Sequence, residues 1–312
     1  MTQLSIVTTM YCSEQYVEQF YQRSILALQK LGISDYEFVL VDDGSPDNSL
    51  HEAVNLIKTD ANVKVIELSR NFGHHKAIIT GLENATGENI FLIDIDLEEA
   101  PELLEVFWAE IHARNNADVD VVYGVQKSRK GGWFERWSGN LYFDLFNLLS
   151  DDVVVKKNLS TVRIMKRKYV EALMKYKEEE FHLGPVCSLV GFKQIPLSIN
   201  KVSHSDSTYN VLKKYNLLIN SIFSFSKKPL YFIFYSGLLM TLLSFSVGGV
   251  ILIQKLLNDT VLDGWTSVMV SIWFLSGIII LFLGTIATYL ARIFDETKKR
   301  PFTVIKTVYR KE

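Results

Sequence analysis

The chain has 312 residues and a formal net charge of −2, so its length allows one large domain or two smaller ones, and no general attraction to nucleic acid is expected. Its two cysteines, Cys12 and Cys187, are too few for a disulfide framework and fit a reducing cytosol.

Strands and helices are predicted to alternate from the start of the chain. Runs of β-branched residues predict the strands, and apolar residues at helical spacing predict the helices. The strands are expected at 4–9, 36–41, 63–68, 89–95 and 119–124, and the helices at 14–31, 49–58, 75–84 and 101–114. This alternation predicts βαβ units and an α/β fold with a mostly parallel sheet.

Farther along, the pattern is less regular. Residues 161–165 and 191–196 are predicted strands, the second at a sheet edge, and residues 133–149 and 168–176 are predicted helices.

Two runs without a charged residue follow, at 229–254 and 264–291. Each exceeds the roughly 20 apolar residues that cross a bilayer, which predicts transmembrane helices near 230–253 and 265–291. A buried helical hairpin of a soluble protein is the alternative. Basic residues flank the outer ends of the pair, which predicts a multi-pass protein of the cytoplasmic membrane with both termini in the cytoplasm.

Residues 210–228 precede the first run and place apolar side chains on one helix face, which predicts an amphipathic helix at the membrane surface. Packing against the soluble domain is the alternative. The predicted organisation is a soluble domain over 1–209, the interfacial helix over 210–228 and a two-span membrane region over 229–312. Small residues such as Gly237 and Gly284 in the spans permit a homo-oligomer.

Asp94 and Asp96 come at the end of the predicted strand 89–95. Residues two apart in a strand share a face, so the two carboxylates are expected to point together and to hold a divalent cation such as Mg²⁺ or Mn²⁺. The alternative is a helix start with Asp96 as its N-cap. Ligands of open α/β sheets bind outside the carboxyl ends of the strands, where both acids are expected.

Polar residues also follow the first three predicted strands, at 9–14, 42–45 and 69–73. Carboxylates there can accept hydrogen bonds from a base or a ribose, and Arg70 offers a planar set of donors. His74 and His75 are expected to be solvated or structural, because adjacent residues at a helix start diverge. The sequence has neither a GxGxxG motif after the first strand nor a P-loop, which argues against a dinucleotide.

The segments 41–45 (VDDGS), 69–73 (SRNFG) and 94–97 (DIDL) resemble the motifs of the family 2 glycosyltransferases, which have the Rossmann-like GT-A fold. With two spans after them, the chain is similar to the polyprenyl-phosphate glycosyltransferases, relatives of dolichol-phosphate mannose synthase, from about Leu4 to Pro301. The resemblance implies inverting transfer of one sugar from a nucleoside-diphosphate sugar to a polyprenyl phosphate, which is undecaprenyl phosphate in bacteria. The transfer would occur at the cytoplasmic face and supply envelope glycan synthesis.

The resemblance also implies the site residues. It assigns nucleotide binding to Thr9, Tyr11, Glu14, Asp42, Asp43, Arg70, Gly73 and Asp94. It assigns catalysis to Asp94, Asp96 and Arg163, and the metal to Asp94, Asp96 and Glu98. A loop at 127–130 is expected over the donor, and contacts to the acceptor phosphate are expected from Arg129, Lys201, Ser207 and Lys213.

Two positions depart from the pattern. Thr161 stands where close relatives often carry an aspartate, and Thr208 where they carry a lysine. A phosphate monoester has its second pKa near 6, so it is largely ionised at about neutral pH. Because an ionised phosphate needs no general base, a phosphate acceptor tolerates Thr161. The alternatives are transfer to the hydroxyl of a lipid-linked saccharide, or a non-catalytic membrane partner that keeps the fold.

Overall fold

The computed structural model describes residues 2–126, 159–176, 183–201, 228–258, 264–298 and 300–311. The chain divides into two units. The sheet unit comprises 1–143, 154–209 and 300–312, and the helical unit comprises 144–153 and 210–299.

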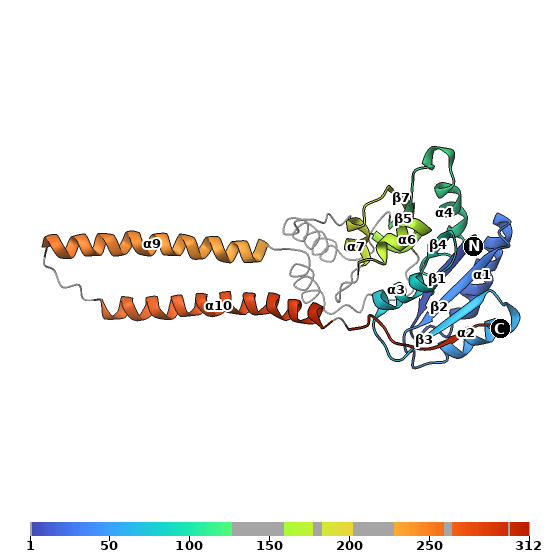
Figure 1. Ribbon diagram of the computed structural model, residues 1–312, viewed down its shortest axis with the longest axis horizontal. Coiled ribbons are helices and arrows are strands. Elements are labelled where there is room, and N and C mark those ends of the chain that lie inside the picture. The colour runs from blue at the N-terminus through green and yellow to red at the C-terminus, as the bar shows by residue number, and fades with distance from the viewer. Residues whose placement is uncertain are drawn as a thin grey trace. The chain divides into compact units, whose positions relative to one another are not determined.

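The sheet unit is built on one mixed sheet, whose strand order among the described residues is β7-β5-β6-β4-β1-β2-β3-β8 (Figure 1). The strands are β1 (Leu4–Met10), β2 (Tyr36–Asp42), β3 (Val63–Leu68), β4 (Asn89–Leu92), β5 (Val121–Gln126), β6 (Leu159–Lys166), β7 (Gln194–Ile199) and β8 (Ile305–Tyr309). β6 runs antiparallel to β4 and β5, and β8 runs antiparallel to β3, whereas the other pairs are parallel. The prediction of a mostly parallel α/β sheet is confirmed.

Helices cover both faces of this sheet. The apolar residues of α1 (Val17–Leu31), α2 (Ser49–Thr59) and α4 (Leu103–Ile111) pack on one face, and those of α3 (His74–Asn84), α6 (Arg167–Leu173) and α7 (Leu183–Leu189) pack on the other. A short 3-10 turn, η1 (Arg114–Asn116), follows α4. Because both faces are covered, β1 and β4 are buried along their whole length, as their continuous apolar runs indicate.

Several boundaries differ from the predicted ones. β4 ends at Leu92, so the strand predicted to reach residue 95 was wrong at its carboxyl end. β7 lies at a sheet edge, as predicted, and α7 was not predicted. The predicted helix 133–149, the loop 127–130 and residues 210–227 of the interfacial helix lie outside the described residues.

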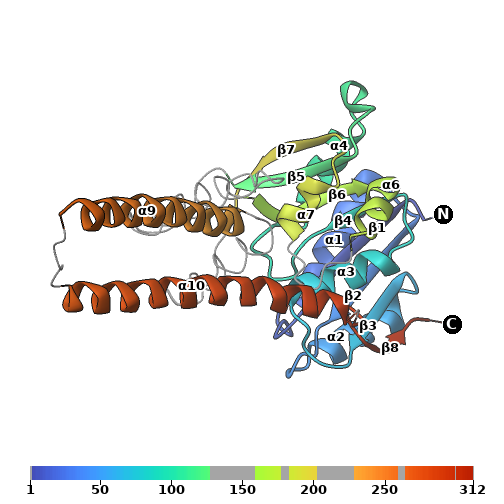
Figure 2. The ribbon, with the colours of Figure 1, turned by 60° about the vertical axis from the view of Figure 1, so that its left-hand side comes forward.

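The carboxyl-terminal residues also differ from the prediction, which included them in the membrane region 229–312. Residues 300–312 belong to the sheet unit, and β8 pairs with β3 at the edge of the sheet (Figure 2). The sheet unit is therefore made of segments from both ends of the chain.

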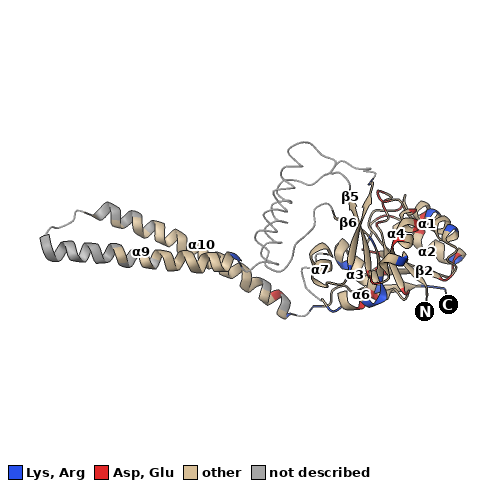
Figure 3. Ribbon diagram, turned by 90° about the horizontal axis from the view of Figure 1, so that it is seen from above, with Lys and Arg blue, Asp and Glu red and all other residues tan. Residues whose placement is uncertain are grey.

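The helical unit contains two long helices, α9 (Lys228–Asn258) and α10 (Trp265–Thr297), which lie side by side and antiparallel (Figures 1 and 2). Their described residues are almost entirely uncharged (Figure 3). Within α10, the 22 residues Phe274–Asp295 are long and apolar enough to cross a membrane, and this is the single such segment among the described residues. The structure thus supports one candidate span by length and composition, where the sequence predicts two.

Candidate active site

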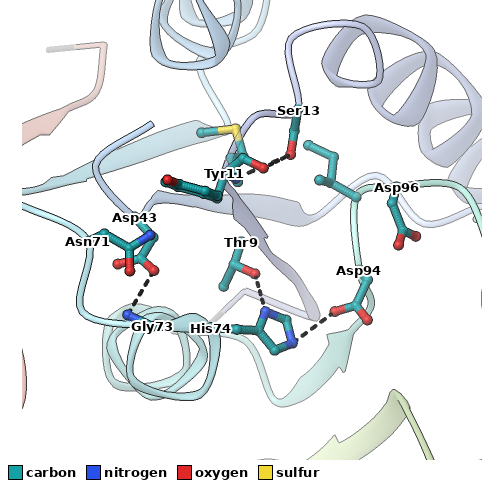
Figure 4. Close-up of a pocket in the computed structure, with 11 residues that line it drawn as sticks. Thr9, Tyr11, Ser13, Asp43, Asn71, Gly73, His74, Asp94 and Asp96 are labelled. Atoms are coloured by element: carbon teal, nitrogen blue, oxygen red, sulfur yellow. Dashed lines mark hydrogen bonds and ion pairs between the residues drawn. The ribbon is translucent and has the colours of Figure 1, made fainter. Parts of the chain in front are cut away.

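A cavity of about 280 Å³ lies at the carboxyl ends of β1, β2, β3 and β4 (Figure 4). Its lining residues lie at the end of β1 or in the segments that follow β1, β2, β3 and β4, and they are Thr9, Met10, Tyr11, Ser13, Asp43, Asn71, Gly73, His74, Asp94, Ile95 and Asp96. The four polar segments singled out in the sequence therefore meet at one place, where open α/β sheets bind their ligands.

Asp94 and Asp96 line this cavity from a turn, not from a strand. The last parallel hydrogen bond joins the Ile93 amide to the Val7 carbonyl at 3.1 Å, and Leu97 then takes a positive φ of 58°. Asp96 Oδ1 accepts a hydrogen bond from the Glu98 amide at 3.0 Å. Burial raises the pKa of Asp96, and the nearby Asp94 charge raises it further. The two acids are close, as expected, although the turn brings them together instead of the alternation of a strand.

His74 is the site residue that sequence reasoning missed. Its Nδ1 atom lies 3.0 Å from Thr9 Oγ1, and its Nε2 atom lies 3.4 Å from Asp94 Oδ1 (Figure 4). The ring therefore links the ends of β1 and β4 across the cavity. Its position at the start of α3, directly after the motif 69–73, could have indicated from the sequence that His74 belongs to the site.

The start of α3 also faces the cavity, since Gly73 and His74 both line it. The amide groups at a helix N-terminus carry a partial positive charge and favour an anionic group such as a diphosphate.

Asp43 holds the loop 69–73 in place. Its carboxylate accepts hydrogen bonds from the Phe72 and Gly73 amides at 2.7 and 2.9 Å, while burial raises its pKa. The next residue, Gly44, has φ of 66°, and a Cβ atom there would lie 2.6 Å from the Arg70 carbonyl carbon. The backbone of 42–45 and that of 69–73 thus pack directly on each other, and only glycine fits between them.

Asp42 is buried at the end of β2 and is not among the cavity-lining residues. One oxygen accepts a hydrogen bond from the Ser45 amide at 3.3 Å, and Oδ1 has no hydrogen-bond partner among the described residues. Burial raises the pKa of Asp42 to about 6.

Glu98 forms an ion pair with Lys201 at 2.9 Å and does not line the cavity. The same lysine lies 3.9 Å from Glu99, whose carboxylate is fully buried. Burial raises the pKa of Glu99 to about 8, with Asp94 as the second cause. The residue expected at the metal and the residue expected at the acceptor phosphate are thus paired with each other.

Arg163 is buried on β6, opposite Leu92 of β4, and does not line the cavity. Its guanidinium donates to the carbonyls of Thr161 and Ser160 at 3.0 and 3.2 Å, and to Cys187 Sγ at 2.7 Å. These contacts hold its head group between β6 and α7.

Of the remaining site residues predicted from the sequence, Tyr11 lines the cavity, whereas Glu14 and Arg70 do not. Tyr11 lines the cavity with half of its surface exposed. Arg70 is exposed and stacks on Phe72 at 4.0 Å, and Glu14 points to Asn48 at the start of α2. Arg129, Ser207 and Lys213 lie outside the described residues.

The donor set fits a hard divalent cation that shares its ligands with a substrate. Among the described residues, no three His, Cys, Asp or Glu side chains are arranged to hold an ion by themselves. Mg²⁺ is usually bound by one or two carboxylates, with phosphate oxygens and water completing its shell. Asp94 and Asp96 provide those two carboxylates on one wall of the cavity.

Comparisons with known proteins point to one family. The family model "Glycosyl transferase family 2" matches residues 5–174. A protein of Mycobacterium tuberculosis named "Putative glycosyltransferases" is 43% identical over 306 residues, covering 98% of this chain and 88% of its own. The uncharacterized glycosyltransferase YkcC of Bacillus subtilis is 33% identical, covering 98% of this chain and 94% of its own. The bactoprenol glucosyl transferase of Shigella phage SfII is 28% identical, and 98% of each chain is covered.

Proposed function

The chain belongs to glycosyl transferase family 2 and is a glycosyltransferase, and we propose that it transfers one sugar from a nucleoside-diphosphate sugar to a polyprenyl phosphate. The main support for this proposal is one cavity whose lining combines two neighbouring carboxylates with the start of α3. The carboxylates are Asp94 and Asp96, and Thr9 and Asp43 also line the cavity. The acceptor class is supported by the relative named bactoprenol glucosyl transferase, which matches along the whole chain.

In the proposed reaction, an oxygen of the lipid phosphate attacks C1 of the donor sugar. The bond between C1 and the nucleoside diphosphate breaks, and the diphosphate leaves with the bonding electron pair. A single displacement of this kind inverts the anomeric centre. The acceptor is already ionised near neutral pH, so no side chain has to remove a proton from it.

The described residues have two tasks in this reaction. Asp43 and Gly44 fix the loop 69–73 and thereby set the position of the N-terminus of α3, where we place the diphosphate. Asp94 and Asp96 would hold Mg²⁺ or Mn²⁺, which offsets the charge of the leaving diphosphate when bound.

We propose that the helical unit anchors the protein in the membrane that contains the acceptor lipid. Apolar side chains of α9 and α10 are exposed, among them Phe232, Leu239, Ile280 and Leu283, as expected of helices that face lipid. We propose that both helices span the cytoplasmic membrane, that the sheet unit lies in the cytoplasm, and that the product supplies envelope glycan synthesis. A homo-oligomer through the small residues of the spans belongs to the same proposal.

The test is to incubate the purified full chain with labelled nucleotide sugars, Mn²⁺ and undecaprenyl phosphate, and to measure labelled lipid. Asp96→Ala should lower the rate by about 10²-fold or more, because the leaving diphosphate loses its charge balance. Asp118→Ala is the matched control, since Asp118 is exposed and pairs with Lys193 at 2.7 Å on the surface. No labelled lipid with any common donor, or full activity in Asp96→Ala, would contradict the proposal.

The same assay separates the alternatives. A glycosyl phosphate is cleaved by mild acid far more readily than a glycoside, so an acid-stable product would favour a saccharide hydroxyl as acceptor. The bases available for that reaction, Asp144, Asp151, Asp152 and Glu180, lie outside the described residues. Nucleotide binding without any transfer would favour a non-catalytic partner.

A further inference from the structure

The segment 302–309, which ends in β8, lies against the strand and the loop that lead into the donor cavity. Lys306 Nζ contacts Glu67 Oε1 at 2.5 Å, and the Tyr309 hydroxyl donates to Glu67 Oε2 at 2.9 Å. Burial would raise the pKa of Glu67, but these hydrogen bonds outweigh burial and hold its pKa below the ordinary value. Glu67 is thus a buried carboxylate whose negative charge is paired with two side chains of the carboxyl-terminal segment.

The same segment holds the loop 69–73 directly. The Ser69 amide donates to the Val304 carbonyl at 2.9 Å, immediately after the end of β3. The neighbouring Thr303 contacts α3, the helix whose first residue lines the cavity. Its hydroxyl lies 2.7 Å from the hydroxyl of Thr80. The loop is therefore held by Asp43 at Phe72 and Gly73 and by Val304 at Ser69, while Thr303 holds α3.

Glu67 also connects β8 to the second strand-end motif. Asp42 and Glu67 are directly opposed on the parallel strands β2 and β3, so their side chains lie on the same face of the sheet. The Glu67 charge acts on Asp42, which is one residue from the anchor Asp43. If Lys306 and Tyr309 were removed, an uncompensated negative charge would stand beside Asp42.

We propose that β8 is part of the donor site, with Lys306 and Tyr309 as positioning residues that act through Glu67 on the loop 69–73 and on Asp42. The ligand affected is the nucleoside diphosphate of the donor, so the inference rests on the proposed function. Neither residue lines the cavity, and their effect on the ligand is indirect.

The experiment uses the full chain in detergent and measures the affinity for UDP, dTDP and GDP, each with Mn²⁺. The double variant Lys306→Met, Tyr309→Phe should bind the preferred nucleotide about tenfold more weakly, because the loop that contacts it is displaced. Lys311→Met is the matched control, since Lys311 is exposed just after the end of β8, and it should leave the affinity unchanged. In a transfer assay, the double variant should raise KM for the donor and leave kcat at saturating donor near the wild-type value.

A second set of variants separates positioning from a general loss of folding. Glu67→Gln removes the charge, and Lys306→Met should then have little further effect in that background, as expected for residues that act through one contact. Additive effects of the two substitutions would overturn the inference, as would wild-type affinity in the double variant. A wild-type chain that binds none of the three nucleotides would overturn the proposed function and this inference together.

Discussion

The imidazole of His74 lies between two strand ends, with Nε2 at 3.4 Å from Asp94 Oδ1 and Nδ1 at 3.0 Å from Thr9 Oγ1. With a proton on Nε2 the ring turns an N–H toward Asp94, and Nδ1 shares a hydrogen bond with the Thr9 hydroxyl, so one ring serves both contacts. This arrangement fixes one oxygen of Asp94 and leaves the other for a cation or a ligand. His74 thus supports a carboxylate of the proposed metal site in the way that outer partners of metal ligands do.

His74→Ala should lower the transfer rate by about tenfold to 100-fold, the range for losing an outer partner of a metal ligand. The measurement is the initial rate over a series of Mn²⁺ concentrations, and the variant should need more Mn²⁺ for half-maximal rate. His51→Ala is the control, because His51 is exposed on α2. An unchanged Mn²⁺ dependence in His74→Ala would show that the ring does not orient Asp94.

Gly44→Ala and Gly32→Ala form a matched pair. Both glycines have φ near 66°, but a Cβ at Gly44 would lie 2.6 Å from backbone atoms of Arg70 and Asn71, whereas a Cβ at Gly32 meets nothing within 4 Å. Gly32→Ala should therefore cost about 1–2 kcal/mol of backbone strain, and Gly44→Ala should cost more and displace the loop 69–73. Thermal unfolding and nucleotide binding check this, and equal effects of the two substitutions would contradict it.

Asp42 should make stability and nucleotide affinity depend on pH in opposite directions. Its pKa rises from 3.8 to about 6 on folding because of burial, so the folded chain holds this proton more tightly than the unfolded chain. Ionisation of Asp42 therefore costs stability as pH rises from 3.8 to about 6, and the cost is complete above that value. Asp42→Asn should raise the unfolding temperature at about pH 7.5 and have little effect at about pH 4.

The binding side of the same prediction follows from the role proposed for Asp42. If the ionised carboxylate accepts a hydrogen bond from the base, nucleotide affinity of the wild type should fall as pH drops through about 6. In Asp42→Asn the affinity should be lower and this pH step should be missing. Calorimetry of nucleotide binding across that range is the measurement, and an identical pH step in both proteins would exclude Asp42 as its source.

Leu283→Arg should reduce stable insertion in the membrane. Leu283 lies in the apolar segment Phe274–Asp295 and has an exposed side chain, and an arginine at the middle of a span costs about 2.5–3.5 kcal/mol. The measurement is the fraction of chain that stays with membranes after alkaline carbonate extraction. Leu26→Arg, at an exposed position of α1, is the control. Full retention of Leu283→Arg would contradict a spanning role for this segment.

The buried strands were predictable because local sequence and final environment agree. Residues such as Ile6, Val39 and Phe91 belong to continuous apolar runs, and those runs are buried under helices on both faces. The cavity followed from the same fact, since parallel strands bring their carboxyl ends together. The positions of the predicted strand ends were therefore enough to predict most of the residues around the cavity.

The relationships that were missed depend on distant residues. His74 meets Asp94 because a turn follows β4 where a longer strand was predicted, and Arg163 is held by Cys187, which lies 24 positions away on the unpredicted helix α7. Lys306 and Glu67 are 239 positions apart, and neither has a local pattern that indicates the other. Pairing of this kind is set by tertiary packing, which periodicity does not report.

Because β8 pairs with β3, the segment that contains α9 and α10 is an insertion in the sequence of the sheet unit. A protein shortened at residue 209 to obtain a soluble enzyme would lose β8 and leave the amides and carbonyls of β3 open to other molecules. Such a fragment is expected to self-associate through that edge. Deleting the hairpin while rejoining residue 209 to residue 300 through a flexible linker would keep the edge covered, and is the better design for a water-soluble form.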